Sequence, residues 1–140
     1  MSVDFIDSNV FVYLFDETVP GKQRIAASLI RGALETRSAC ISFQVVQETL
    51  SVLTRKLAVP VTPAHAENVL HTMLMPLWRV MPSRQLYAAA LALQSRLGFG
   101  FYDSLIVAAA LEAGCARLLT EDLQHGQRIE GLRIENPFRT

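Results

Sequence analysis

The sequence predicts an α/β fold in which helices cover both faces of a parallel sheet of about five strands, as a three-layer α/β/α sandwich. Short apolar runs alternate with longer segments of helical periodicity, and the apolar runs are continuous rather than alternating with polar residues. Such continuous runs are typical of parallel strands that are buried on both faces. With 140 residues, 51% of them hydrophobic, we expect one core and a single domain over residues 1–140.

The first half of the chain is expected to hold two strands and three helices. Apolar runs place the strands at Val3–Asp7 and Ala39–Ser42. Ser8 or Asn9 can cap a short helix after the first strand, and a longer helix follows the loop at Pro20. Ser42 can cap the third helix. These predicted helices span residues 10–15, 22–36 and 43–57.

Proline and glycine divide the second half. Thr62 can cap a helix that begins with Pro63, because proline is favoured in a first helical turn. Gly98 and Gly114 are typical of positions that end a helix. The predicted helices therefore span residues 63–74, 83–97 and 102–113. The predicted strands span residues 78–81, 117–120 and 132–135.

The charge composition neither requires nor excludes a nucleic-acid partner. The 13 basic and 13 acidic residues give a formal net charge of zero, so composition alone does not demand a nucleic-acid partner. Acids that gather in one cleft would nevertheless leave basic residues elsewhere. Only Lys22 and Lys56 among the 13 cations are lysines. The arginine bias suits a phosphate ligand, because arginine can form two parallel hydrogen bonds with it, but it also suits GC-rich coding.

The sequence further predicts a cytoplasmic protein without a membrane anchor. Cys40 and Cys115 stand apart in apolar or small surroundings and lack zinc-ligand spacing, so both are expected to be buried reduced thiols. The acidic start, MSVDFID, is unlike a signal peptide. The longest purely apolar run, Leu105–Leu111, is too short to span a bilayer.

Four acidic residues lie where apolar runs give way to loop or helix: Asp7, Glu48, Asp103 and Asp122. Carboxylates are costly near a core, and open parallel sheets bind ligands beyond the carboxyl ends of their strands. Asp7 ends the first predicted strand, Glu48 follows the second by about a turn and a half of helix, and Asp122 follows the fourth. Asp103 opens the helix that leads into the fourth strand. All four are therefore expected at the same edge of the sheet.

Each acid also has an ordinary explanation when it is taken alone. Asp7 can cap the short helix, and Glu48 can lie on a solvated helix face. Asp103 can interact with the dipole of its helix, and Asp122 can be a loop residue. The functional prediction therefore depends on the joint placement of the four acids.

Carboxylates that converge require protons or a cation. Two carboxylates ~4 Å apart repel each other by about 4 kcal/mol at an effective dielectric constant of ~20. Oxygen ligands favour Mg²⁺ or Mn²⁺, which can activate a water and neutralise charge on a phosphate. Ser8, Asn9 and Thr120 could hold waters or carboxylates there, although caps and turns explain them equally simply. His125 is left outside the site.

The chain resembles the PIN-domain ribonucleases, and within them the VapC-type toxins of bacterial toxin–antitoxin pairs. The resemblance is carried by FIDSNVFVYLFD, SFQVVQETLSVL, FYDSLIVAAALEAGC and RLLTEDLQHGQRIEGLRIENPF. The family's acidic quartet maps onto Asp7, Glu48, Asp103 and Asp122, and this pattern favours Asp122 over Glu121. The segment from residue 57 to residue 83 matches least.

The resemblance implies a PIN-like fold and a Mg²⁺- or Mn²⁺-dependent endoribonuclease that hydrolyses RNA phosphodiesters through a metal-activated water. It also implies a homodimer and inhibition by a cognate antitoxin. The quartet would supply both the metal ligands and the catalytic residues. The alternative is a non-catalytic PIN-fold module that binds RNA or a partner protein.

Two other classes that use acids at strand ends are disfavoured. A receiver-like phospho-acceptor domain needs a lysine near its last strand, and no lysine follows Lys56. A phosphatase of the DxD type needs a second acid two residues after the first, where Asn9 follows Asp7.

Overall fold

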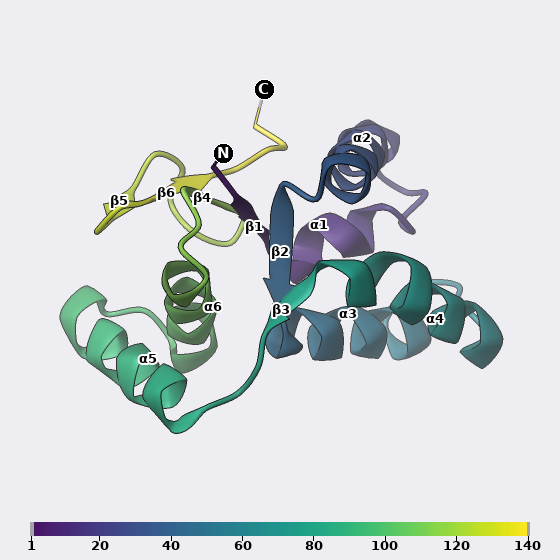
Figure 1. Ribbon diagram of the computed structural model, residues 1–140. Coiled ribbons are helices and arrows are strands. Elements are labelled where there is room, and N and C mark those ends of the chain that lie inside the picture. The colour runs from purple at the N-terminus through teal and green to yellow at the C-terminus, as the bar shows by residue number, and fades with distance from the viewer. Residues whose placement is uncertain (1, 140) are drawn as a thin grey trace.

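The computed structural model describes residues 2–139 and shows one six-stranded sheet with helices on both sides (Figure 1). The strand order is β3-β2-β1-β4-β6-β5. These strands are β1 (Asp4–Ile6), β2 (Ala39–Ser42), β3 (Trp78–Val80), β4 (Arg117–Leu119), β5 (Arg128–Ile129) and β6 (Leu132–Glu135). All pairings among the first four and β6 are parallel. The predicted α/β fold with a parallel sheet is confirmed. The first and last residues of the predicted domain, residues 1 and 140, lie outside the described residues.

The short strand β5 is the main difference from the predicted sheet. It runs antiparallel to β6, with Ile129 opposite Leu132. The hairpin turns at Glu130, which has a positive φ of 55°. A two-residue strand is too short to show a period-two pattern, so the sequence offered no periodic signal for it.

Six α-helices surround the sheet in the described part of the chain. They are α1 (Ser8–Tyr13), α2 (Pro20–Thr36), α3 (Phe43–Arg55), α4 (Pro63–Val69), α5 (Arg84–Leu97) and α6 (Phe101–Glu112). Figure 1 shows α5 and α6 on one side of the sheet and α1 and α2 on the other. Gly98 and Gly114 adopt left-handed backbone angles just after α5 and α6, as predicted. No helix within residues 2–139 has the length and apolar character needed to cross a bilayer.

Several helix boundaries differ from the predictions: α1 begins and ends two residues earlier, α2 begins at Pro20, and α3 ends at Arg55. Asp7, rather than Ser8 or Asn9, is the N-cap of α1, and its side chain accepts a hydrogen bond from the Ser8 amide. The helix predicted over residues 63–74 ends as an α-helix at Val69. It continues as the π-helical turn η1 (Leu70–Leu74) and the 3-10 turn η2 (Met75–Leu77). Pro76 lacks the amide hydrogen that an α-helix would use there.

Helix α6 is the element that connects the core to the acidic edge. Its residues 104–110 are all buried, because α5 covers the side that faces away from the sheet. The alanines at 108–110 allow this close packing. Since α6 is locked in place along most of its length, Asp103 in its first turn has a fixed position.

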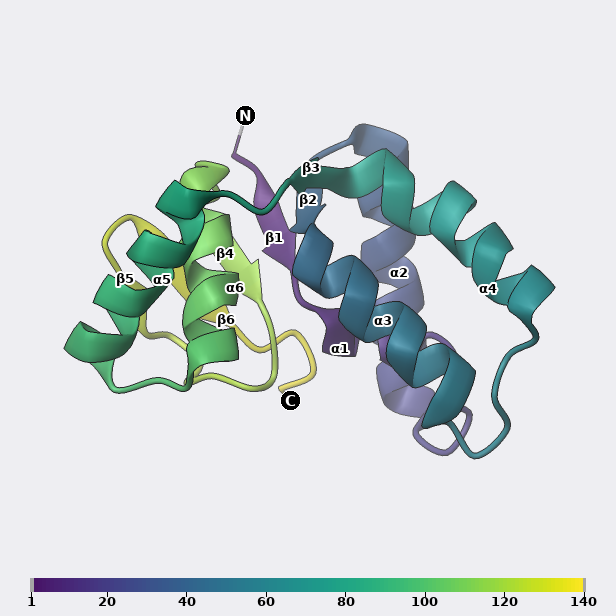
Figure 2. The same cartoon turned by 90° about the horizontal axis from the view of Figure 1, so that it is seen from below.

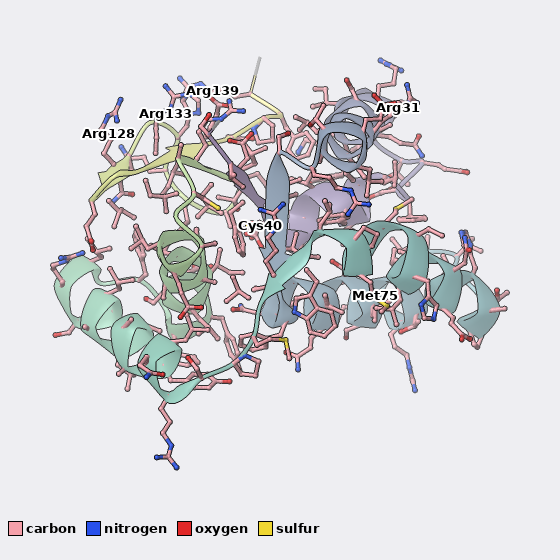
Figure 3. All side chains as sticks on the ribbon, in the orientation of Figure 1. Arg31, Cys40, Met75, Arg128, Arg133 and Arg139 are labelled. Atoms are coloured by element: carbon pink, nitrogen blue, oxygen red, sulfur yellow. The ribbon has the colours of Figure 1, made fainter. Side chains whose placement is uncertain are left out.

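Several arginines lie on or after β4, β5 and β6. Arg117, the first residue of β4, forms ion pairs with Asp4 at the amino end of β1 and with Glu135 at the carboxyl end of β6, both at 2.6 Å. Arg128 of β5 is the register partner of Arg133 of β6, and Figure 3 labels both at these strands. Within residues 2–139, the ion pairs of Arg117 and Arg133 therefore involve Asp4 and Glu135 and none of the four predicted site acids.

Candidate metal centre

Asp7 lies directly after β1 and is the most enclosed of the four predicted site residues. Figure 2 shows β1 leading into α1 between α6 and α3. The Asp7 residue is only 5% exposed. Its carboxylate accepts hydrogen bonds from the Ser8 amide at 2.7 Å and from Thr120 Oγ1 at 2.8 Å. The carboxyl ends of β1 and β4 therefore meet at this side chain.

Glu48 approaches Asp7 from helix α3. The Ser8 hydroxyl donates to Glu48 Oε1 at 3.0 Å and lies 3.5 Å from Asp7 Oδ1. Ser8 was predicted as a cap or as a support for the acids. It supports them, because its single hydroxyl lies between the two carboxylates.

Asp122 joins the same network through Asn9 and Thr120. Asn9 Nδ2 donates to Asp122 Oδ2 at 3.2 Å and to Thr120 Oγ1 at 3.1 Å. The Asp122 amide also donates to Thr120 Oγ1 at 3.1 Å. Short polar side chains thus connect the loop after β4 to Asp7.

Asp103 is the third residue of α6 and reaches the edge from the other side. Gln44, in the first turn of α3, links this helix start to Glu48. Gln44 Nε2 donates to Glu48 Oε2 at 3.2 Å and to the Tyr102 carbonyl at 3.1 Å. The structure therefore brings the four predicted acids to one edge of the sheet, with Gln44 as a connector.

The electrostatics agree with this convergence. The pKa of Asp7 is raised from 3.8 to about 7. Burial is the main cause, the hydrogen bonds with Thr120 and Ser8 oppose the rise, and the nearby charges of Glu48 and Asp122 add to it. Burial also raises the pKa of Asp103, and Asp122 adds to that effect. Asp7 and Asp103 would both be easier to ionise beside a cation.

The donor chemistry of the site fits a hard divalent ion. All four acids offer carboxylate oxygens, and the buried Asn9 Oδ1 lacks a hydrogen-bond partner. Within residues 2–139, no group of three or more His, Cys, Asp or Glu side chains is close enough to hold a metal ion as it stands. In this arrangement, the side chains of Ser8, Asn9 and Thr120 lie between the carboxylates and donate hydrogen bonds to them.

Glu121 was the alternative to Asp122, and the structure engages it elsewhere. The Tyr13 hydroxyl donates to Glu121 Oε1, and Lys22 Nζ lies 3.0 Å from Glu121 Oε2. Lys22 also lies over the Tyr13 ring, 4.7 Å from its centroid. These contacts support Asp122 as the fourth acid.

Sequence reasoning missed Gln44, Tyr13 and Lys22. Gln44 had a local signal, because it precedes Glu48 by one helical turn. His125 was left outside the site, and its Nδ1 accepts a hydrogen bond from the Asn136 amide at 3.0 Å. Cys40 and Cys115 are free and buried, as predicted, with their sulfur atoms 3.5 Å apart.

The fold and the site together define a class: an α/β domain with a mostly parallel sheet whose carboxyl edge gathers acidic residues. The model of the PIN domain family matches residues 5–128. This chain therefore belongs to the PIN-domain family. A comparison with curated proteins gives no match.

Solved structures share the fold over nearly the whole chain. A toxin–antitoxin complex from Klebsiella pneumoniae has a TM-score of 0.69 at 18% identity, covering 96% of this chain and 97% of that one. DNA-bound VapBC from Salmonella typhimurium has a TM-score of 0.68 at 22% identity, covering 98% and 99%. The sarcin–ricin loop cleaving toxin VapC20 from Mycobacterium tuberculosis has a TM-score of 0.61 at 19% identity, covering 85% and 89%. The predicted resemblance to PIN-domain, VapC-type toxins is confirmed at the level of family and fold.

Proposed function

We propose that the protein is a metal-dependent endoribonuclease and the toxin of a toxin–antitoxin pair. The observation that carries the proposal is the hydrogen-bonded network that joins the buried Asp7 to Glu48 and Asp122 at the carboxyl edge of a PIN-domain sheet. Similar folds in an RNA-cleaving toxin and in toxin–antitoxin complexes give further support.

Asp7, Glu48, Asp103 and Asp122 would hold Mg²⁺ or Mn²⁺. When bound, this ion would activate water for attack and neutralise charge on the phosphate. Ser8, Asn9 and Thr120 orient the carboxylates, and we assign no side-chain nucleophile. The acids on their own repel an RNA phosphate, so neutralisation of the site must precede substrate binding.

The test is cleavage of a single-stranded RNA by the purified chain with and without divalent ions. We expect cleavage with Mg²⁺ or Mn²⁺, none with EDTA, and recovery when Mn²⁺ is added in excess of the chelator. Cleavage that is undiminished by EDTA, after prior dialysis against the chelator, would refute the metal-dependent mechanism.

A non-catalytic PIN module that binds RNA or a protein is the second candidate. It is favoured by the absence, within residues 2–139, of a ready-made group of three metal-binding side chains. Titration calorimetry with Mn²⁺ separates the two candidates. A nuclease must bind Mn²⁺ at the acids and lose that binding on Asp103→Asn substitution, whereas a binding module has no need of Mn²⁺ there.

The proposed biological role adds an antitoxin, a homodimer and a cytoplasmic location. Buried free thiols at Cys40 and Cys115 suit a reducing compartment. Expression of the chain alone should arrest growth of a bacterial host, and co-expression of a small protein encoded beside it should relieve the arrest. Sedimentation of the purified chain would give its oligomeric state.

Substitution of the two adjacent acids after β4 should have unequal effects. Asp122→Asn is expected to lower the RNA cleavage rate by about 10–100-fold, because it removes a proposed ligand from an exposed loop. Glu121→Gln should change the rate by less than about threefold, since Lys22 and Tyr13 hold Glu121 away from the other acids. Initial rates at saturating Mn²⁺ provide the measurement. A larger loss of cleavage rate for Glu121→Gln than for Asp122→Asn would mean that Glu121, and not Asp122, is the fourth ligand.

A further inference from the structure

Four aromatic rings form a continuous chain from the core to the surface beside the acids. Phe43 of α3 contacts Tyr87 of α5 edge-to-face, with ring centroids 6.4 Å apart. Tyr87 stacks on Phe101 of α6 at 6.4 Å with an interplanar angle of 11°. Phe101 contacts Tyr102 edge-to-face at 5.4 Å. The first ring is buried, while Tyr102 is 67% exposed.

The exposed end of this chain is tied to the candidate site by two connections. Tyr102 directly precedes Asp103, so their α-carbons are about 3.8 Å apart. The Tyr102 carbonyl also accepts the hydrogen bond from Gln44, whose side-chain amide donates to Glu48 as well. Gln44 is itself buried. The backbone at Tyr102 is therefore held at a defined position between a residue of α3 and a residue of α6 that belong to the quartet.

A large exposed aromatic ring at this position needs a reason. Phe101, which itself stacks on Tyr87, contacts the Tyr102 ring on one side and limits its movement, so less conformational entropy would be lost when a flat group stacks on it. Unpaired nucleobases are flat groups of this kind, and proteins that bind single-stranded RNA stack them on aromatic side chains. A base stacked on one such side chain typically contributes about 5–150-fold in affinity.

We propose that Tyr102 is a stacking platform for an unpaired RNA base and that it positions the neighbouring phosphate at the quartet. This inference rests on the proposed function, and it narrows the substrate to RNA with an unpaired base next to the scissile bond. Tyr102 is a positioning residue here, because the ring holds the RNA and does not act on the reacting bond. Stacking is tolerant of base identity, so Tyr102 would select unpaired structure rather than sequence.

An exposed aromatic ring could instead contact a second copy of the chain. The base is favoured because the Tyr102 carbonyl is linked to Glu48 through Gln44 and because Tyr102 adjoins Asp103 in the sequence, so the residue that carries the ring lies beside two of the proposed ligands. A contact between copies needs neither link.

The experiment compares Tyr102→Ala, Tyr102→Phe and Leu91→Ala. Leu91 is an apolar residue of α5 that is 56% exposed and lies outside the aromatic chain, so it is a control for general loss of surface area. Each substitution is made in the Asp7→Asn chain, in which cleavage is expected to be lost and the carboxylate charge of the site is lower, so that binding can be measured on intact RNA. Fluorescence anisotropy in Mn²⁺ then measures binding of a labelled single-stranded oligoribonucleotide and of versions with one abasic position placed along it. Circular dichroism confirms that each variant is folded.

Tyr102→Ala should weaken binding of the intact oligonucleotide by about 5–150-fold, while Tyr102→Phe and Leu91→Ala should stay within about twofold. An abasic position should weaken binding to the parent chain at one place and should have little effect on Tyr102→Ala. In the cleavage-competent chain, Tyr102→Ala should raise KM more than it lowers kcat.

Equal affinities for Tyr102→Ala and its parent would overturn the inference. It would also be overturned if sedimentation showed that Tyr102→Ala dissociates a dimer and if the loss of RNA binding were no larger than the loss of dimer. These outcomes are distinct from failure of the proposed function. If the Tyr102→Ala variant cleaves RNA normally, the stacking role of Tyr102 is wrong and the nuclease proposal stands. If the parent chain never cleaves RNA, the nuclease proposal is wrong, but base-dependent binding at Tyr102 can still be observed.

Discussion

Asp7→Asn is expected to lower the rate of RNA cleavage by at least about 100-fold, a loss of roughly 2.7 kcal/mol of transition-state stabilisation. The substitution removes the central carboxylate charge at the end of β1 and preserves the size of the side chain. The amide oxygen can still accept the hydrogen bond from the Ser8 amide, which caps α1. Loss of activity should therefore occur in a folded protein, as measured by initial rates at saturating Mn²⁺ alongside circular dichroism.

Asp16→Asn is the matched control for this experiment. Asp16 lies in the loop after α1, where its carboxylate accepts hydrogen bonds from the amide and hydroxyl of Thr18. The same chemical change at that position leaves the quartet intact, so cleavage should persist at the unsubstituted rate. Retention of full activity by Asp7→Asn would remove Asp7 from the catalytic site and with it the central ligand of the proposed centre.

The second large effect concerns stability, and it has the opposite sign. In the metal-free protein at pH 8, Asp7→Asn should raise the free energy of unfolding by about 1–3 kcal/mol. Burial raises the pKa of Asp7 to about 7, so the ionised side chain destabilises the folded state above that pH. A neutral amide avoids this cost. The gain should be smaller than the full shift implies, because Asn reproduces the hydrogen bonds of Asp7 only in part.

The pH dependence of this difference follows from proton linkage. The unfolded chain releases the Asp7 proton near its ordinary pKa of 3.8, and the folded chain retains it until about pH 7. Between these values the folded state holds the additional proton, so the contribution of Asp7 to stability falls as pH rises. The advantage of Asp7→Asn should be smallest near pH 4, increase toward pH 7 and level off above it.

Urea denaturation of both proteins in EDTA from pH 4 to pH 8 measures this difference. Subtracting one curve from the other removes the contributions of groups that titrate identically in both chains. A difference that is independent of pH would contradict the burial of an ionisable Asp7. Saturating Mn²⁺ should reverse the order at pH 8, because an ion that binds the native chain stabilises it by about 2.7 kcal/mol at 100 times its dissociation constant.

Much of the fold was predictable because its signals are local. The short apolar stretches within residues 4–6, 39–42 and 117–119 indicate buried strands without reference to any other part of the chain. Gly98 and Gly114 end helices through their own backbone conformation. The same local pattern placed the four acids after strands or at a helix start. The short antiparallel strand β5 was missed because two residues carry no periodicity.

The arrangement of the candidate site was less predictable. Asn9 contacts Thr120, which is 111 positions away, and Lys22 contacts Glu121, which is 99 positions away. No local pattern indicates either contact. Distinguishing Glu121 from Asp122 required the structure, since the two are adjacent, equally acidic and follow the same strand. The connection from Gln44 to the Tyr102 carbonyl likewise depends on how α3 and α6 are placed against the sheet.

The amino-acid sequence by itself determined the α/β class, the order of the helices and of every described strand except β5, and the acidic positions at the ends of apolar runs. Those properties arise from hydrophobic burial and backbone preference, which act over a few neighbouring residues. Only the tertiary structure decided that Ser8, Asn9 and Thr120 connect the carboxylates, that Lys22 and Tyr13 withdraw Glu121, and that an aromatic chain ends beside Asp103. Hydrogen bonds and ring contacts require atoms within a few ångströms of one another, and folding alone brings such distant residues that close.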